Sequence, residues 1–171
     1  RTHYEYARRF SEHFGKTIPG IFTDEPQNYN GFPWSRLFQK KFEEEFGYNP
    51  LDKAYLLVLD REGYIEYRVN YYRLCEEMMN HAFYRPLSRF CEAHNLILTG
   101  HLGMEERITQ MAVNHGGIYS HLKVFQMPGI DALGVGDGLT PGLANMEAPN
   151  FSVKAVSSIA HLQGKNRVLC E

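Results

Sequence analysis

Four short apolar runs in the sequence each end in, or contain, side chains that can transfer protons. The first run is followed by Asp24 and Glu25, the second contains His101, the third contains Asp131, and the last ends in Glu171. Carboxyl and imidazole groups are the usual general acids and bases of enzymes, and a carboxyl pair can cleave a glycosidic bond. The runs are PGIFT (19–23), LILTGHL (96–102), MPGIDAL (127–133) and NRVLCE (166–171).

Helical patterns separate these runs. Apolar residues at three- and four-residue steps predict helices over 4–14, over 35–46, from 61 onward, within MEERITQMAV (104–113) and over 151–162. We expect Pro86 to kink or break the long helix that starts at 61. The stripes predicted to be buried are Tyr4, Ala7, Phe10 and Phe14; Leu37, Phe38, Phe42 and Phe46; Ile65, Val69, Tyr72, Cys75, Met79 and Ala82; and Val153, Val156, Ile159 and Ala160.

The alternation of strand and helix patterns predicts an α/β fold in which crossover helices connect parallel strands. The apolar runs are continuous, which is typical of strands that are buried on both faces. Because the pattern starts on a helix and ends on a strand, we expect an incomplete (β/α) barrel of the TIM type. It would have about four strands and form a single domain over 1–171. Open sheet edges would favour self-association.

In such a barrel the catalytic side chains stand at the carboxyl ends of the strands. Two carboxylates from different strands, facing one cleft, would favour glycoside hydrolysis, in which one protonates the leaving oxygen and the other stabilises or attacks the sugar. Two alternatives stay open. Asp24, Glu25, His101 and Asp131 could converge on a divalent metal in a metal-assisted hydrolase, although no paired-histidine spacing is present. The domain could also bind sugars without cutting them.

Each candidate also has a purely structural interpretation. Asp24 and Glu25 could interact with a helix dipole, and Glu105 could be a first-turn acid. His101 could be a core histidine that donates to a backbone carbonyl. Asp131 could cap a turn. For the functional interpretation, we assign Asp24, His101, Asp131 and Glu105 to contacts with substrate.

A loop rich in turn formers, QNYNGFPW (27–34), follows the first strand and carries Tyr29 and Trp34. These aromatic rings could cover the barrel mouth or form a platform for a sugar, and we assign them to substrate binding. A long connection rich in glycine and proline, 134–150, is typical of a functional loop. Its GVGDG stretch lacks the strand-to-helix context that a phosphate-binding loop needs.

The composition limits the classes of molecule that we expect the protein to bind. The net charge is −2 with acids and bases interspersed, so neither nucleic acid nor a membrane surface is indicated, and no apolar stretch is long enough to span a bilayer. Aromatic residues make up 13%, which suits either a large core or a carbohydrate cleft. Three cysteines without CxxC spacing predict buried free thiols rather than disulfides or a zinc site. We expect no cofactor and no bound metal.

Two of the motifs resemble barrel glycoside hydrolases of clan A. IFTDEP (21–26) is similar to the end of the fourth strand in that clan, where Asn-Glu-Pro supplies the acid/base, so the resemblance implies that Glu25 is the proton donor. Asp24 stands where the clan generally has Asn, which normally contacts the sugar 2-hydroxyl. RVLCE (167–171) is similar to the end of the seventh strand, which implies that Glu171 is the nucleophile.

A longer set of motifs resembles a large group of bacterial glycoside-hydrolase-like proteins with sugar-binding accessory domains, loosely related to the alpha-L-rhamnosidases. This resemblance implies that the chain covers roughly the fourth to seventh strands of a barrel and that its partner is a carbohydrate substrate. The compartment stays open, with the bacterial cytoplasm favoured. The motifs are IFTDEP, PW (33–34), FGY (46–48), LTGHL (98–102), PGID (128–131) and RVLCE.

Overall fold

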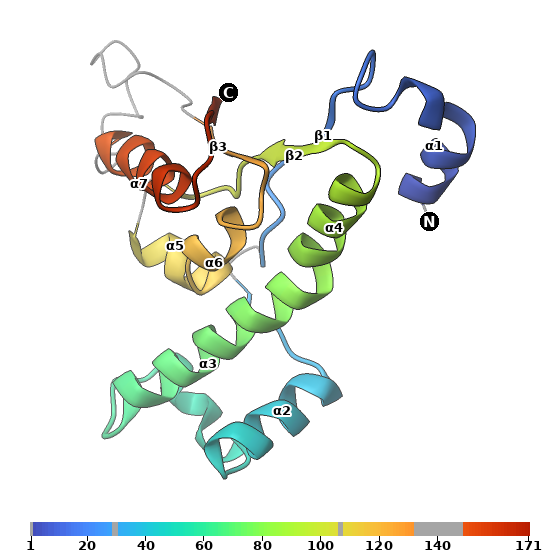
Figure 1. Ribbon diagram of the computed structural model, residues 1–171. Helices are drawn as coiled ribbons and strands as arrows, with labels where there is room; N and C mark the ends of the chain where they lie inside the picture. The colour runs from blue at the N-terminus through green and yellow to red at the C-terminus, as the bar shows by residue number, and fades with distance from the viewer. Residues whose placement is uncertain (1, 29–30, 106–107, 132–148) are drawn as a thin grey trace.

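The structure is a computed structural model that describes residues 2–28, 31–105, 108–131 and 149–171. It contains α-helices, short 3₁₀ segments (η1, η2), one π-helical turn (η3) and parallel strands (Figure 1). In chain order these are α1 Thr2–Phe10, η1 Ser11–His13, β1 Gly20–Thr23, α2 Arg36–Phe46, η2 Pro50–Leu57, α3 Tyr64–Met79, η3 Asn80–Tyr84, α4 Arg85–Ala93, β2 Ile97–Gly100, α5 Ile108–His115, α6 Tyr119–Leu122, β3 Met127–Ile130, α7 Pro149–Leu162 and β4 Leu169–Cys170.

The strands form one parallel sheet in the order β1-β2-β3-β4. Thr23 pairs with Gly100, Gly100 with Pro128, and Ile130 with Cys170, so the carboxyl ends of all four strands meet at one edge. The predicted α/β class, with four parallel strands and crossover helices, is therefore confirmed. Closure into a barrel, the single-domain assignment and self-association through the outer strands stay predictions.

Burial of β1 on both faces, expected from its apolar run, is wrong. Phe22 is 43% exposed, and no residue of β1 is fully buried. β1 is an outer strand that pairs only with β2, so one of its edges has no neighbouring strand in the described structure. An apolar run therefore does not distinguish an outer strand from a central one.

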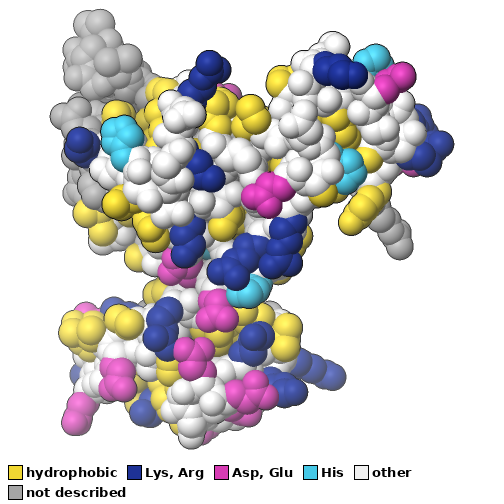
Figure 2. All heavy atoms as spheres, viewed as in Figure 1, with side chains coloured by type: hydrophobic (Ala, Val, Ile, Leu, Met, Phe, Trp, Pro, Cys, Tyr) yellow, Lys and Arg dark blue, Asp and Glu magenta, His cyan; other side chains and the backbone are white. Residues whose placement is uncertain are grey.

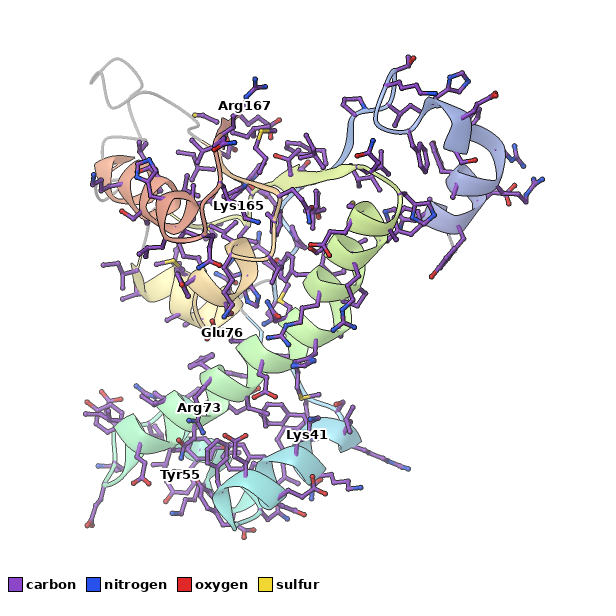
Figure 3. All side chains as sticks on the ribbon, viewed as in Figure 1. Lys41, Tyr55, Arg73, Glu76, Lys165 and Arg167 are labelled. Atoms are coloured by element: carbon purple, nitrogen blue, oxygen red, sulfur yellow. The ribbon has the colours of Figure 1, made fainter. Side chains whose placement is uncertain are left out.

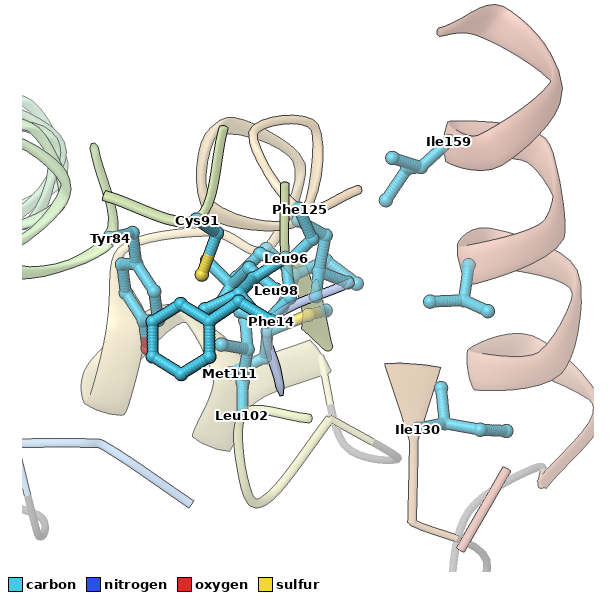
Figure 4. Packing of buried hydrophobic residues seen from close by; sticks show 13 residues of the cluster. Phe14, Tyr84, Cys91, Leu96, Leu98, Leu102, Met111, Phe125, Ile130 and Ile159 are labelled. Carbon is cyan, nitrogen blue, oxygen red and sulfur yellow. The ribbon is translucent and has the colours of Figure 1, made fainter. Parts of the chain in front are cut away.

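A compact core lies between the sheet and the helices that flank it. Figure 4 shows Leu96, Leu98 and Phe125 packed together, with Ile130 of β3 and Ile159 of α7 on the side of the cluster where this helix lies. Val156, Ile159 and Ala160 are buried as predicted, but Val153 is 51% exposed, so its predicted inward position is wrong.

A second core lies in a helical unit made by α2, η2 and the first part of α3, below the sheet in Figure 1. Ser35 caps α2 by accepting a hydrogen bond from the Phe38 N–H at 3.0 Å, and Gly47 ends it with φ +79°. Aromatic rings fill this core, so part of the aromatic surplus serves packing. Its fully buried members are Phe38, Phe42, Leu56, Tyr67, Tyr71, Leu74 and Cys75.

The stripe predicted for the helix from 61 onward is wrong at its start and at its end, where Ala82 is exposed. Ile65 and Val69 are 63% and 58% exposed, whereas Tyr67 and Tyr71 are buried. The tyrosine hydroxyls find partners inside the unit: Tyr67 donates to the Pro50 carbonyl at 2.8 Å and Tyr71 to the Pro33 carbonyl at 2.7 Å. A satisfied hydroxyl removes the penalty for burying tyrosine, so the rings take the inner face. Leu37 of α2, also predicted buried, is 56% exposed.

The disturbance expected at Pro86 takes the form of the π-helical turn η3, which joins α3 to α4. Pro86 is the second residue of α4, where its missing N–H costs little. The extra residue of a π turn changes which side chains face the core. Here it directs Asn80 and Tyr84 into the protein, where both are buried.

The stripe predicted for the first helix is also wrong. Tyr4 and Phe10 are 73% and 39% exposed, and only Phe14, beyond the end of α1, is buried. Figure 1 shows α1 standing apart from the other helices. One ring of α1, Tyr4, meets Phe90 of α4 edge-on at 5.5 Å between centroids.

All three cysteines are free thiols; Cys75 and Cys91 are buried, but Cys170 is exposed because β4 is an outer strand. Within the described ranges, no helix combines the length and apolar character needed to cross a bilayer. The predicted connection over 134–150 falls almost wholly outside the described residues.

Two buried histidines lie in neighbouring helices: His115 is the last residue of α5, and His121 belongs to α6. His121 Nε2 donates to the His115 carbonyl at 3.1 Å, while Nδ1 lies 3.3 Å from the amide nitrogen of Asn80 and accepts from it. Burial lowers the pKa of His121 to about 4, and burial likewise lowers that of His115. A proton added to Nδ1 would point at the Asn80 amide hydrogens, so the folded protein favours the neutral ring.

Substitution within α2 should distinguish its two faces. We expect Phe42→Ala to lower the free energy of unfolding by about 3 to 5 kcal/mol, because it opens a cavity among fully buried rings. Leu37→Ala, on the exposed face of the same helix, should change it by less than about 0.5 kcal/mol. Urea denaturation measures both. Similar losses for the two variants would contradict the second core.

Acid should weaken the fold through His121. The pKa of His121 is lower in the folded protein than the ordinary value of 6.5. Between pH 6.5 and about 4 the unfolded state therefore takes up a proton that the folded state does not, so the free energy of unfolding falls as the pH falls through this range. We expect a loss on the order of 2 kcal/mol from this residue, measured by urea denaturation at pH 7 and pH 4.5. His121→Gln should have a smaller pH dependence than the unmodified protein. An unchanged pH dependence would refute the assignment.

Candidate active site

The polar side chains predicted at the strand ends do gather at the carboxyl edge of the sheet. Asp24 and Glu25 follow β1, His101 follows β2, Asp131 follows β3 and Glu171 follows β4. One oxygen or nitrogen from each of Asp24, His101 and Glu171 lies within 4.8 Å of the others, and the same holds for Glu25, His101 and Asp131. His101 is common to both groups and is the centre of the cluster.

The imidazole of His101 is 1% exposed and is surrounded by carboxylates. Its Nε2 lies 2.7 Å from Glu171 Oε2 and 3.3 Å from Asp24 Oδ1, and its Nδ1 lies 3.9 Å from Glu105 Oε1. Because carboxylate oxygens accept hydrogen bonds, Nε2 must carry a proton. The contacts therefore differ from those of a core histidine bound to a backbone carbonyl. Phe22 packs edge-on against the ring at 5.7 Å.

Two glycines allow His101 to take this position. Gly100 has φ +128°, and a Cβ there would overlap the backbone carbonyl of Thr23, so β1 and β2 can approach only at a glycine. Gly103 has φ +61°, and a Cβ there would lie 2.7 Å from Gln27 Nε2 and 3.3 Å from Glu25 Cβ. The turn after β2 is therefore packed directly against the loop that carries Glu25.

Glu105 is buried and supports the end of β3. Its Oε1 accepts a hydrogen bond from the Asp131 N–H at 3.0 Å, and its side chain is 2% exposed. The carboxylate joins two strand ends, and its interpretation as a first-turn acid stays a prediction, because residues 106–107 before α5 lie outside the described ranges. The contact places Glu105 behind His101, so access to a substrate would require movement of the cluster.

Asp131 is 8% exposed, and its Oδ1 has no hydrogen-bond partner within the described part of the chain. Burial raises the pKa of its carboxyl group; His101 opposes this shift, whereas Glu171 and Asp24 add to it. A carboxyl group with a raised pKa holds a proton more readily than an ordinary aspartate does.

Glu25 is half-buried and has φ +44°, a strained backbone for a residue other than glycine. The next residue, Pro26, is held in place by a hydrogen bond, because the Tyr84 hydroxyl donates to its carbonyl at 2.9 Å. Burial raises the pKa of the Tyr84 phenol, so the hydroxyl keeps its proton. Tyr84 fixes the Glu25 loop, yet sequence reasoning did not identify it, since its inward position depends on the π turn.

Trp34, one of the two aromatic residues assigned to a sugar platform, is not brought together with this cluster. Trp34 is 42% exposed, lies 5.5 Å from the Phe38 ring, and lines a cavity of about 330 Å³ between the loop before α2 and the helix α3–η3. Its contacts are those of the helical unit. Tyr29 lies outside the described residues. A role in substrate binding stays a prediction for both.

The cluster offers ligands that suit a divalent cation or a polyhydroxylated substrate. Carboxylate oxygens and one imidazole nitrogen can coordinate a metal ion, and the same groups can bind sugar hydroxyls. The groups that meet the spacing of a metal site are Asp24, His101 and Glu171, and Glu25, His101 and Asp131.

Comparisons with protein-family models, with curated proteins and with solved structures give no match to this chain.

Proposed function

We propose that this cluster is the active site of a glycoside hydrolase acting on a carbohydrate substrate. Glu25 is the proton donor and Glu171 is the second carboxylate, while Asp24 and Asp131 bind sugar hydroxyls. The proposal is supported above all by one observation: carboxylates from β1 and β4, at opposite edges of the sheet, both approach His101. Cleavage of a glycosidic bond needs two carboxyl groups on either side of the same carbon–oxygen bond.

The surroundings of Glu171 suit a carboxylate that stabilises or attacks the sugar cation. The Nε2–H of His101 donates to one of its oxygens at 2.7 Å, which fixes the orientation of the group. Its side chain is 54% exposed, so the other oxygen can reach a bound substrate. His101 is thus a positioning residue for Glu171, and a hydroxyl contact of its own would require one carboxylate to move.

The surroundings of Glu25 suit a proton donor. Glu25 is half-buried, and one of its carboxylate oxygens lies within 4.8 Å of ligand atoms of His101 and Asp131, so it faces the same histidine as the second carboxylate. Glu105 anchors Asp131, and Tyr84 anchors the loop after Glu25. The acid is therefore held by residues that do not themselves need to touch the sugar.

The loss of kcat/KM on removal of the proton donor should depend on the leaving group of the substrate. We expect Glu25→Gln to lower kcat/KM by about 10² to 10⁴ for a glycoside whose leaving alcohol needs protonation, and far less for a dinitrophenyl glycoside. Glu171→Gln should impair both substrates. Initial rates are measured with a panel of sugars, each supplied with both kinds of leaving group. The control is Glu62→Gln, which changes an exposed residue between η2 and α3.

Equal losses on both substrates for Glu25→Gln would contradict its role as the acid. Full activity of both variants would overturn the glycosidase proposal. Saturable sugar binding without cleavage, seen in the unmodified protein, would favour a carbohydrate-binding role for the same cluster.

Metal-assisted hydrolysis is a second candidate, favoured by the two groups of three metal-compatible ligands and by the buried, unpartnered Oδ1 of Asp131. The two-carboxylate mechanism predicts that hydrolysis continues at the same rate after treatment with EDTA. Loss of activity on chelation, restored by one divalent ion and not by others, would support the metal-assisted alternative instead. A rate that EDTA does not change would exclude it.

A further inference from the structure

A concave surface lined by cations lies beside α4, at the end of the sheet opposite the carboxylate cluster. Lys123 precedes β3 and Lys165 precedes β4, so both belong to segments that enter the strands at their amino ends. The sheet is parallel, which places this surface away from the candidate active site. The cavity has a volume of about 250 Å³ and is lined by Arg85, Ser88, Arg89, Glu92, Lys123, Val124 and Lys165.

The cations of this cavity have no acidic partners of their own. Within the described part of the chain, no carboxylate lies within 4.0 Å of the charged nitrogens of Arg85, Arg89, Lys123 or Lys165. Figure 2 shows Lys and Arg side chains gathered across the middle of the visible face, and Figure 3 labels Lys165 between α7 and β4. Like charges gathered in a chain of net charge −2 repel one another, and a bound anion would relieve the repulsion.

Part of the cavity is already ordered for a ligand. Arg85 is half-buried, and its Nε donates to Asn80 Oδ1 at 2.6 Å, which holds the guanidinium in place. Its terminal nitrogens have no hydrogen-bond partner among the described residues. The Ser88 hydroxyl, which belongs to the lining of the cavity, donates to the Val124 carbonyl at 2.7 Å. An orientation that is fixed before binding lowers the entropic cost of holding a ligand.

The single acid in the cavity is already engaged. Glu92 Oε1 accepts a hydrogen bond from Gln126 Nε2 at 3.1 Å, and the same nitrogen lies 3.1 Å from Ser88 Oγ. Glu92 therefore lines the side of the cavity without pairing with its cations. The four cations exceed this one carboxylate, so the cavity keeps a net positive charge.

We propose that this cavity binds a compact tetrahedral dianion, a phosphate or sulfate group, either free or as an ester. Guanidinium and ammonium groups that converge from α4 and from two separate strand-entry segments suit an anion with three or more acceptor oxygens better than a flat monovalent carboxylate. The inference is independent of glycosidase chemistry at the other end of the sheet.

Titration of the ¹⁵N-labelled protein with inorganic phosphate, at constant ionic strength, tests the proposal. We expect saturable shifts of backbone amides in 85–92, 123–126 and 164–166, similar shifts with sulfate, and much weaker binding of acetate. Titration with phenyl phosphate distinguishes a phosphate ester from the free ion as the ligand: tight binding indicates an ester, and weak binding indicates the free ion. Shifts that stay linear with concentration, or equal binding of acetate, would overturn the proposal.

Variants make the test specific to the cavity. Arg89→Gln combined with Lys165→Gln should weaken phosphate binding by about tenfold or more, whereas Glu92→Gln should strengthen it by removing a repulsive charge. Lys154→Gln combined with Lys41→Gln is the matched control: it removes the same charge from one exposed and one half-buried position elsewhere. Equal weakening by both double variants would show general charge attraction and refute the site. The amide shifts of the unmodified protein decide the question if a variant does not fold.

Discussion

The hydrogen bond between His101 Nε2 and Glu171 Oε2 joins the second strand of the sheet to the fourth at their carboxyl ends. Burying an imidazole nitrogen costs free energy unless it finds a polar partner, and here carboxylates supply one for Nε2, whereas Nδ1 has no hydrogen-bond partner among the described residues. This requirement draws Asp24 and Glu171 toward one point, although the two residues are far apart in sequence. Without it, the acids at the strand ends would be separate surface charges.

The support for this contact comes from residues with no chemistry of their own. Gly100 lets β1 and β2 approach at the point where a side chain would strike Thr23, and Gly103 lets the following turn meet the Glu25 loop. Tyr84, turned inward by the π-helical segment, holds the other side of that loop through Pro26. The carboxylates are therefore positioned by backbone geometry and by a buried hydroxyl.

The two ends of the sheet carry opposite charge. Acids that follow the strands gather at the carboxyl end, and cations that precede β3 and β4 gather beside α4 at the amino end. Parallel pairing causes this separation, because every strand contributes its leading segment to one edge and its trailing segment to the other. The helical unit adds a separate aromatic core to the same chain, connected to the sheet through α3 and α4.

The sequence by itself determined the strands, their parallel order and the residues at their carboxyl ends, because continuous apolar runs and helix periodicity are local signals. Burial was decided by the tertiary structure. Val69 is exposed and Tyr71 is buried, since a tyrosine whose hydroxyl reaches the Pro33 carbonyl can occupy a core position. The pairing of His101 with Glu171, the position of Tyr84 and the cationic cavity also depend on contacts between distant segments. No local pattern encodes such contacts, because their energies exist only once the strands and helices have packed together.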